Sequence, residues 1–466
     1  MSRSTRTGSL VLYRRNNKRQ STGKYVVGML LESKIVLRLS GVAGATAGFF
    51  LTRGVIMKGP KTLVSFAVAA AMAGLASGAV AGGFAIGTQS GSGTGNAFAG
   101  GAAGADDASV AWYNPAAMTL IPGKQVAGAL HVLKPSFKFE NNGSTSPAGT
   151  GEGGDEDDWA YVPNAFFTMA INPNMSFGLA LNVPFGLTTE YDAGWRGQFT
   201  ALKSEIKTVN INPSIAYKLN NMVSIGGGLS VQMIEAELSN SAGAAGISTL
   251  KADDMGYGYN LGIMIQASPS TRIGAHYRSK IKYELEGTVA FSVATPGNGD
   301  VKADLEVPDS LSISAFHTLN PNWELMGDIT WTGWSSVERL QVIRTSGAGS
   351  GTTLTTLQFN WDDTWRYSVG ANYKMNPQTK LRFGVALDKT PTNDVDRTAR
   401  LPDQDRTWLA FGVQYKPSKA GILDFGYAHE FIDDAKINNS QGAAGQLTGT
   451  FKNKADIFSV QYAHSF

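Results

Sequence analysis

The sequence predicts an all-β protein, a transmembrane antiparallel β-barrel of about 14 strands with an N-terminal hatch, or plug, domain. Three observations predict this fold. Apolar residues recur at every second position through most of the chain, short turns alternate with longer polar segments, and a Gly- and Ala-rich region precedes the first strand pattern. No later segment has an apolar run long enough for a membrane helix, so a membrane would have to be crossed by strands.

The strand periodicity is clearest at the C-terminal end. Phe458, Val460, Tyr462, His464 and Phe466 fall on one face of the expected strand, and Ser, Gln and Ala residues fall on the other. A period of two residues is typical of a strand with one apolar face. The same alternation runs through residues 223–233, 365–373, 409–415 and 423–427.

Short segments rich in Asn, Pro and Ser separate these strands, and Asn and Pro suit tight turns. They lie at 172–174, 220–221, 269–270, 320–322, 376–378 and 417–418. Longer polar segments alternate with them, near 140–158, 187–200, 239–252, 294–300, 345–352, 390–404 and 439–448. This alternation of short and long connections is typical of an outer-membrane barrel with periplasmic turns and extracellular loops. Six turns and seven loops would connect roughly fourteen strands across residues 123–466.

A soluble β-sandwich or propeller is the alternative fold. No repeat of blade length is visible, and Tyr, Trp and Phe near the strand ends are typical of the aromatic girdles of membrane barrels. The terminal Phe466 resembles the signal through which the barrel-assembly machinery recognises outer-membrane proteins. His464 departs from that pattern, because another bulky aromatic or apolar residue usually stands there.

The composition excludes several function classes. The 466 residues include no Cys, which removes disulfides, thiol catalysis and Cys-ligated metals. The net charge of +3 arises at the N-terminus: residues 1–56 hold ten of the 40 basic residues and one of the 37 acidic ones, which leaves 30 basic and 36 acidic residues afterwards. No basic patch for nucleic acid is therefore expected in the folded part.

Residues 57–81 predict a secretory signal peptide. Lys58 and Lys61 form a short positive region, an apolar core follows, and Ala79-Val80-Ala81 fits the small-x-small cleavage pattern. Because a signal normally stands at the N-terminus, we interpret residues 1–56 as an extension from a start codon assigned too early, with Met57 as the true start. A genuine cytoplasmic extension is the alternative. The mature chain is expected to begin near Gly82.

Residues 82–122 do not alternate and are too rich in Gly and Ala to build a core of their own. We therefore expect them to lie inside the barrel as a hatch. The run Gly91-Ser92-Gly93-Thr94-Gly95 invites a phosphate-loop interpretation, but Asn96 breaks the motif and no strand precedes it.

A set of ordered motifs across residues 82–466 resembles the FadL family of long-chain fatty acid outer-membrane transporters. The motifs are Gly83-Phe84, Asn96-Ala97-Phe98-Ala99-Gly100, Ala105-Asp106-Asp107-Ala108, Asn114-Pro115-Ala116, Pro184-Phe185-Gly186-Leu187, Trp195-Arg196-Gly197, Thr330-Trp331-Thr332-Gly333-Trp334 and Leu401-Pro402-Asp403-Gln404-Asp405-Arg406. The segment 1–56 and His464 depart from the family.

The resemblance implies a fourteen-stranded barrel closed by an N-terminal hatch that carries the motif Asn114, Pro115 and Ala116. It also implies a hydrophobic ligand, bound first at an outer groove and then in an internal pocket, and a kink in the third strand through which the ligand leaves sideways. Residues 175–183 read as that third strand, which makes Pro184, Phe185 and Gly186 the kink candidates. Alternatively, Pro184 marks the end of the strand.

An alkyl chain gains roughly 0.8 kcal/mol per buried methylene, so the pocket should be lined by apolar and aromatic side chains. Phe84 and Ile86 are our candidates for contact with the ligand, and the alternative is that they pack against the barrel wall. A fatty-acid carboxylate also favours a cation, but the sequence does not distinguish among the inward Lys and Arg residues.

We therefore expect a Gram-negative outer-membrane protein that transports long-chain fatty acids or similar hydrophobic compounds, aromatic hydrocarbons included. Transport would proceed by capture in an apolar lumen pocket, hatch rearrangement and lateral exit. A general diffusion porin for polar solutes and a surface adhesin or receptor are the alternatives. A porin would need an open, charged lumen, and an adhesin would function through its long loops.

No catalytic site, metal site or cofactor is expected, so the protein is not expected to be an enzyme. The five His residues are scattered over different strands, which does not favour a lipase in the wall.

The acidic run Asp155-Glu156-Asp157-Asp158 is interpreted as a solvated loop, with divalent cations bridging lipopolysaccharide as the alternative. The expected partners are outer-membrane lipid and lipopolysaccharide, and the expected state is a monomer.

Overall fold

The computed structural model describes residues 82–146, 149–156, 159–293 and 295–466. By its contacts the chain divides into Met1–Met57 and Lys58–Phe466. The predicted extension 1–56 and the predicted signal peptide 57–81 lie outside the described residues, as do the side chains of 155–158.

One antiparallel sheet contains all the strands and closes on itself, because β1 pairs with β21 along its whole length. The strands are β1 (Lys124–Asn141), β2 (Asp155–Glu156), β3 (Ala160–Asn172), β4 (Met175–Asn182), β5 (Gly186–Glu190), β6 (Lys203–Lys218), β7 (Val223–Ser241), β8 (Ile247–Ser268), β9 (Thr271–Arg278), β10 (Ile281–Phe291), β11 (Gly299–Val307), β12 (Ser310–Thr318), β13 (Trp323–Thr332), β14 (Arg339–Arg344), β15 (Thr353–Gln358), β16 (Thr364–Lys374), β17 (Thr379–Asp388), β18 (Arg406–Tyr415), β19 (Gly421–Ile432), β20 (Ala435–Ser440) and β21 (Gln446–Ser465).

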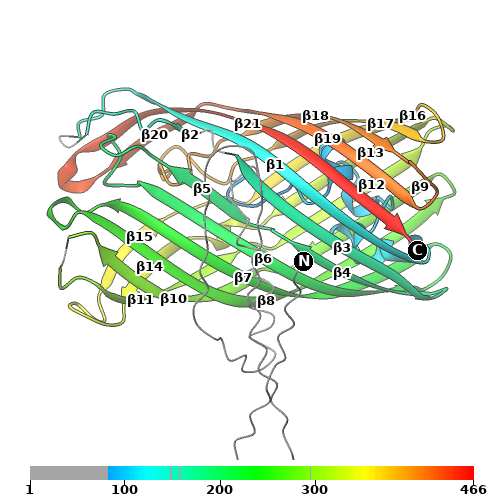
Figure 1. Ribbon diagram of the computed structural model, residues 1–466, viewed down its shortest axis with the longest axis horizontal. Coiled ribbons are helices and arrows are strands. Elements are labelled where there is room, and N and C mark those ends of the chain that lie inside the picture. The colour runs from blue at the N-terminus through cyan, green and yellow to red at the C-terminus, as the bar shows by residue number, and fades with distance from the viewer. Residues whose placement is uncertain (1–81, 147–148, 157–158, 294) are drawn as a thin grey trace, which may run out of the picture. The chain divides into compact units, whose positions relative to one another are not determined.

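These segments form fourteen passes across the barrel wall. β2 is a two-residue addition in a loop, and six passes are built from two successive segments: β4 with β5, β9 with β10, β11 with β12, β13 with β14, β15 with β16, and β19 with β20. Figure 1 shows the tilted strands surrounding the lumen. The predicted antiparallel barrel of about 14 strands is confirmed.

The turns and loops follow the predicted alternation, with differences in two of the longer segments. In the segment 439–448, β20 ends at Ser440 and β21 begins at Gln446, so five residues remain between the paired strands. All six predicted short turns separate consecutive strands. The polar segment 239–252, however, is mostly strand, because β7 and β8 pair as far as Ser241 and Ile247 and leave five residues between them. Polar residues beyond the membrane still pair as strands, since hydrogen bonding to the partner does not depend on an apolar face.

Side chains alternate between the lumen and the lipid-facing surface. On β21, Ile457, Ser459 and Gln461 are buried, whereas Phe458 and Val460 are exposed on the outside. No helix in the described part of the chain is long and apolar enough to cross a membrane. After β21, Phe466 is exposed and its backbone N donates to Lys124 O at 2.9 Å; its role in assembly stays a prediction.

Residues 82–122, which we term the hatch, form short helices inside the barrel, drawn in blue in Figure 1. They are α2 (Gly91–Thr94), η1 (Gly101–Ala103), α3 (Val110–Tyr113) and η2 (Pro115–Leu120). Three further 3-10 turns lie in loops: η3 (Gly243–Ala245), η4 (Trp334–Ser336) and η5 (Gly442–Ala444). The hatch helices pack against the inner wall, and η2 contacts β6, β7 and β8.

Candidate functional site

The third pass of the wall is broken at the residues that the sequence marks as a kink. β4 ends at Asn182 and β5 begins at Gly186. Pro184 and Phe185 lie in the break, and Gly186 resumes the pairing with β6. Because Pro has no N–H to donate to a ladder, an interruption is expected at this position.

The break leaves part of the second pass paired with β1 on one side and without a paired strand on the other. The ladder between β3 and β4 ends at Ala165 and Leu181, and no pairing joins residues 160–164 to β5 in the described ranges. Unpaired backbone in a membrane wall is costly unless protein or water covers it.

The first part of the hatch, residues 82–90, covers this break. Ile86 N donates to Pro184 O at 2.8 Å, and Gly186 N donates to Phe84 O at 2.9 Å. We term residues 82–90 the N-terminal segment and residues 91–122 the hatch body. The N-terminal segment therefore pairs with the interrupted pass through one antiparallel bridge, Ala85 with Phe185.

Phe84 lies in an aromatic cluster on the wall. Its ring centroid is 5.0 Å from that of Trp334, 5.7 Å from that of Phe185 and 5.8 Å from that of Trp361. Phe84 and Trp334 are fully buried. Aromatic pairs at such separations and tilted angles add to the free energy gained by burial.

Two buried carboxylates hold the backbone at the start of the described chain. Gly83 N donates to Asp403 Oδ2 at 2.8 Å, and Gly82 N lies 3.4 Å from Asp388 Oδ2. Arg406 forms an ion pair with Asp403. The position of the N-terminal segment therefore depends on charged residues of β17, β18 and the loop between them.

A cavity of about 200 Å³ lies in the lumen beside the N-terminal segment. Apolar and aromatic side chains form much of its lining, among them Ile86, Phe98, Trp112, Tyr113, Phe185, Trp334 and Trp408. Polar groups enter it from β9, β13 and β16, namely His276, Arg278, Asp328, Thr330 and Arg366. Of the two predicted ligand-contact residues, Ile86 lines this cavity, whereas Phe84 packs in the aromatic cluster described above.

Two arginines reach the cavity and differ in their partners. Arg366 lies 3.8 Å from the Asp388 carboxylate and donates to Ala97 O at 2.8 Å. Arg278 lies over the Trp112 ring, 3.3 Å from its centroid, and donates to Trp112 O at 3.0 Å. Within the described residues Arg278 has no carboxylate partner, so its positive charge is available to an anionic ligand.

The predicted hatch motif acts as a structural anchor in the described chain. Asn114 Nδ2 donates to Ala102 O at 2.7 Å and to Ile263 O on the wall at 2.9 Å. Its Oδ1 accepts from Ala116 N at 3.0 Å, and Pro115 begins η2. Asn at the N-cap and Pro at the first helical position both favour a helix start.

Glycines of the wall admit the backbone of the hatch body. A Cβ at Gly226 would lie 2.6 Å from Ala116 N, and one at Gly426 would lie 2.7 Å from Thr94 Cβ. These distances leave no room for a side chain. The hatch backbone also approaches Gly274, Gly384 and Gly412, whereas Gly178 and Gly262 face side chains of the hatch.

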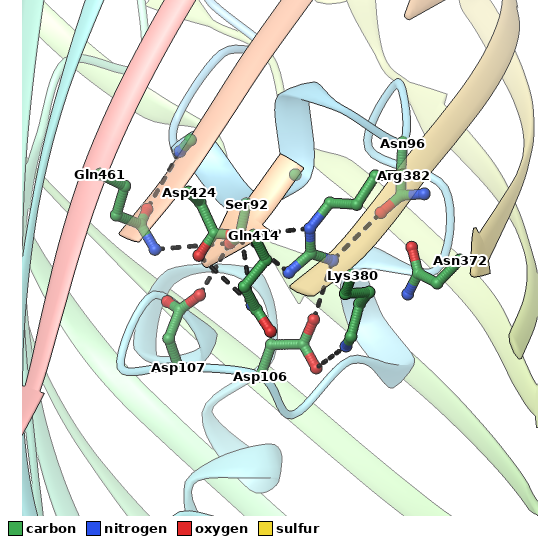
Figure 2. A network of polar contacts seen from close by, with 12 residues as sticks. Ser92, Asn96, Asp106, Asp107, Asn372, Lys380, Arg382, Gln414, Asp424 and Gln461 are labelled. Atoms are coloured by element: carbon green, nitrogen blue, oxygen red, sulfur yellow. Dashed lines mark hydrogen bonds and ion pairs between the residues drawn. The ribbon is translucent and has the colours of Figure 1, made fainter. Parts of the chain in front are cut away.

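A buried network of charges also fixes the hatch body to the wall (Figure 2). The Arg382 guanidinium donates to Asp424 Oδ1 at 3.0 Å, to Asp106 Oδ2 at 2.9 Å and to Asn96 Oδ1 at 3.3 Å. Lys380 lies 3.5 Å from Asp106. Arg382 therefore joins two parts of the hatch body to β19.

The Asp106 carboxyl has a pKa well below its ordinary value. Burial alone would raise this pKa, but attraction to Lys380 and Arg382 and the hydrogen bond from Arg382 outweigh that effect. Asp106 is therefore ionised at neutral pH and contributes to the attachment of the hatch body.

Sequence reasoning singled out some of these residues and missed others. Trp334 and Asp403 belong to motifs quoted for the family resemblance, but nothing in the sequence indicated that both lie against the N-terminal segment. Arg278 and Arg382 were missed. Their inward positions in alternating strands were visible, but many other residues share that signal.

The family model of the outer membrane protein transport proteins (OMPP1/FadL/TodX) matches residues 72–466. The chain belongs to this family. It is therefore an outer-membrane transport protein of the Gram-negative type and not an enzyme, as predicted.

Named relatives span nearly the same region. Outer membrane protein P1 of Haemophilus influenzae is 30% identical, with 79% of this chain and 92% of the relative covered. The long-chain fatty acid transport protein of Escherichia coli K12 is 27% identical, with 79% and 91% covered.

Solved structures show the same fold. A Pseudomonas aeruginosa FadL homologue superposes with a TM-score of 0.76 at 26% identity, covering 83% of this chain and all of that one. The Pseudomonas putida toluene transporter TodX superposes with a TM-score of 0.63 at 17% identity, covering 81% and 98%.

Proposed function

We propose that this protein takes up long-chain fatty acids, or similar hydrophobic carboxylates, across the outer membrane. The observation that carries this proposal is the lumen cavity in which aromatic side chains surround Arg278, a cation without a carboxylate partner in the described chain. A buried charge is unfavourable unless it is paired, so an anionic head group would be stabilised there. An alkyl chain would contribute roughly 0.8 kcal/mol per methylene removed from water.

Apolar side chains in the extracellular half of the lumen support a route to the cavity. They form a cluster that includes Leu285, Leu305, Leu340 and Val342 and that extends to Phe84 and Trp334. We propose that the ligand enters along this cluster and reaches the cavity beside the N-terminal segment. A porin for polar solutes is less well supported, because the hatch occupies the lumen.

We further propose that the ligand leaves sideways through the break at Pro184. The N-terminal segment is joined to the break by two backbone hydrogen bonds and by the Gln89 side chain, so its displacement would uncover residues 183–186 and leave the pairing of β4 and β5 with β6 intact. Ligand binding would favour the displaced state by its higher affinity for that state, and no energy source is needed.

A neutral aromatic hydrocarbon is the second candidate ligand, because the structural neighbours include toluene transporters. Such a ligand offers no charge to Arg278. The two classes are therefore separated by measuring the affinity of purified protein for dodecanoate, dodecanol and toluene, with Arg278→Met as the variant.

We expect Arg278→Met to weaken dodecanoate binding roughly tenfold to a hundredfold, the range for a lost hydrogen bond to a charged group, while dodecanol binding stays nearly unchanged. Arg339→Met, at an exposed arginine, is the control. Equal loss for both ligands, or preferential binding of toluene, would contradict the carboxylate proposal.

Deletion of residues 83–86 tests whether the N-terminal segment controls the opening at the break. We expect it to change ligand affinity and fatty-acid uptake in an outer-membrane mutant that depends on this protein. Unchanged affinity and uptake would contradict the role of the N-terminal segment. Equal uptake with and without the protein, together with steady ion conductance in bilayers, would favour a porin.

The site of maturation is proposed from the sequence alone, because Ala79-Val80-Ala81 fits the small-x-small cleavage pattern. We infer cleavage after Ala81. Intact mass and N-terminal sequencing of the protein isolated from outer membranes test this inference, and a mature chain that retains residues 57–81 would contradict it.

A further inference from the structure

The lumen cavity has one wall that consists of polar side chains. Four neighbouring strands, β9, β12, β13 and β16, form this wall (Figure 1), and polar residues occupy all their inward positions along the cavity. The hatch contributes Ile86, Phe98 and Trp112 to the lining. A cavity for a plain hydrocarbon chain would be apolar on all sides, because a polar group that loses water without gaining a partner is unfavourable.

The strand register arranges these polar side chains in two rows across the wall. The upper row, on the extracellular side, consists of Arg278, Ser310, Thr332 and Thr364, each opposite the next in the register. The lower row consists of His276, Ser312, Thr330 and Arg366 in the same order. Side chains that are directly opposite each other in adjacent strands are close enough to act on one ligand.

The hydroxyl groups of the lower row bond to one another and to the wall. Ser312 Oγ lies 2.7 Å from Thr330 Oγ1, and Thr330 Oγ1 donates to Asp328 Oδ1 at 2.7 Å. Below this row, Ser314 Oγ donates to Asp328 and accepts from Ala102 N of the hatch at 2.9 Å. The lower row therefore stabilises the wall and its contact with the hatch.

The hydroxyl groups of the upper row have no such partners. Those of Ser310, Thr332 and Thr364 line the cavity and form no hydrogen bond with any described residue. They lie in the same row as Arg278, the cation that has no carboxylate partner in the described chain. The upper row thus combines one cation with three hydroxyl groups that are available to a ligand.

Trp408 provides an independent observation in the same cavity. Its side chain is 1% exposed, and its indole N–H has no hydrogen-bond partner among the described residues. Its ring neighbours Phe98 and Arg366 offer no acceptor in their side chains. Because a buried Trp N–H usually finds a partner, the cavity contains an unpaired donor in addition to the three hydroxyl groups.

The upper row is long enough to follow an alkyl chain. Adjacent strands lie roughly 4.8 Å apart, so the row spans roughly 14 Å from β9 to β16. An extended chain advances roughly 1.2 Å per single bond, which is the rise of an extended polypeptide residue divided among its three bonds. A fatty acid whose carboxylate pairs with Arg278 would therefore reach Thr364 about eleven or twelve bonds further along.

We propose that the cavity selects fatty acids that carry a hydroxyl group far from the carboxylate, and that Thr332 and Thr364 recognise this hydroxyl. The inference rests on the proposed uptake of hydrophobic carboxylates and names the members of that class that fit the cavity best. A ligand hydroxyl can donate to one threonine and accept from another, and the Trp408 N–H is a further donor. A plain alkyl chain would displace water from the row without replacing its hydrogen bonds.

Ligand binding to the protein purified from outer membranes tests this proposal. The probes are dodecanoate, 12-hydroxydodecanoate and 2-hydroxydodecanoate, which differ only in the presence and place of one hydroxyl group. The wild type is compared with Thr332→Val/Thr364→Val, in which methyl groups replace the two hydroxyls. The control is Thr168→Val/Ser368→Ala, which removes two buried lumen hydroxyls outside the cavity lining. Heat-modifiable mobility in SDS gels confirms that each variant has folded as a barrel.

We expect the wild type to bind 12-hydroxydodecanoate roughly fivefold more tightly than dodecanoate, the net effect of one hydrogen bond between neutral groups. It should bind 2-hydroxydodecanoate about as tightly as dodecanoate. Thr332→Val/Thr364→Val should reverse the preference and bind 12-hydroxydodecanoate roughly tenfold more weakly than dodecanoate, because the ligand hydroxyl would then be buried without a partner. The control pair should keep the preference of the wild type.

A preference for 12-hydroxydodecanoate that persists in Thr332→Val/Thr364→Val would overturn this inference and leave the proposed function intact. The same holds for an equal preference for 2-hydroxydodecanoate, and for weaker wild-type binding of 12-hydroxydodecanoate than of dodecanoate. Failure of all three carboxylates to bind would instead contradict the proposed function, and with it this inference.

Discussion

The two parts of the hatch are attached to the barrel in different ways. The hatch body, residues 91–122, touches wall glycines with its backbone and is joined to the wall by the network around Arg382. The N-terminal segment, residues 82–90, is held by pairing across the break at Pro184, by Asp388 and Asp403, and by the aromatic cluster around Phe84. The first attachment combines close backbone contacts with buried ion pairs, whereas the second consists mainly of hydrogen bonds and aromatic packing.

This difference indicates which part of the hatch can act as a gate. Displacing the body would require several buried charges to separate, and a buried charge without its partner is strongly unfavourable. Displacing the N-terminal segment exposes Phe84, Ile86 and a few small polar side chains, and breaks the hydrogen bonds of Gln89, but it separates no ion pair of its own. Local opening of this kind needs less free energy than global unfolding.

Among the variants, Arg382→Leu is expected to lower the free energy of unfolding the most. Loss of the guanidinium leaves Asp424 buried without its partner, and breaking a buried pair in this way costs about 3–5 kcal/mol. Urea unfolding in detergent micelles measures the change. Arg339→Leu, at an exposed arginine, should change stability little. Equal midpoints for the two variants would show that the network does not fix the body.

Gly226→Val is expected to lower the free energy of unfolding by a smaller amount. The new side chain would meet the backbone of Ala116, and overpacking of this kind costs about 1–3 kcal/mol. The matched control is Gly128→Val, at a glycine whose added Cβ would meet no atom within 4 Å. Thermal unfolding compares the two, and a similar melting temperature would contradict the close approach.

Phe84→Ala should affect the N-terminal segment far more than the barrel. The variant removes the ring that packs on Trp334, so the segment should open more often. Hydrogen exchange resolved by peptide should rise in residues 82–90 and stay unchanged in residues 91–122, with the midpoint of global unfolding hardly altered. Faster exchange throughout the hatch would mean that the two parts move together.

The smallest effect concerns pH. The pKa of Asp106 is below its ordinary value of 3.8. The stability that the ionised carboxylate contributes to the folded protein is therefore fully present above pH 3.8 and is lost as the pH falls further. We expect the hatch body to loosen progressively below about pH 4 and to be insensitive to pH between 5 and 7. Asp106→Asn should remove part of this dependence, and an identical pH profile in this variant would exclude Asp106 as its source.

The sequence alone was sufficient to predict the barrel, because the alternation of apolar residues and the residue types of turns are local signals. Phe458 and Val460 indicate their face without any knowledge of the partner strand. Residues 239–252 were interpreted as a loop, because hydropathy does not distinguish a paired polar strand from a loop once the strand leaves the membrane.

The candidate site could not be predicted in the same way, because it is formed by contacts between residues far apart in the sequence. Arg382 and Asp106 are separated by 276 residues, and the contact of Gly83 with Asp403 spans 320 residues. Such pairs follow from the closure of the barrel and from the path of the hatch within it. The family resemblance pointed to Pro184, which lies in the break of the third pass, and to Phe84, which lies in the aromatic cluster, but it gave no information on the partners of either residue.

The interruptions in four neighbouring passes have a consequence for how such barrels diversify. β10, β11, β14 and β15 form one patch at the extracellular end, and short breaks separate them from β9, β12, β13 and β16 below. Strand register need not be continuous across these breaks. Insertions and substitutions in the upper patch can therefore accumulate without altering the fit between hatch and lower wall, so ligand preference can change between species while assembly and closure are preserved.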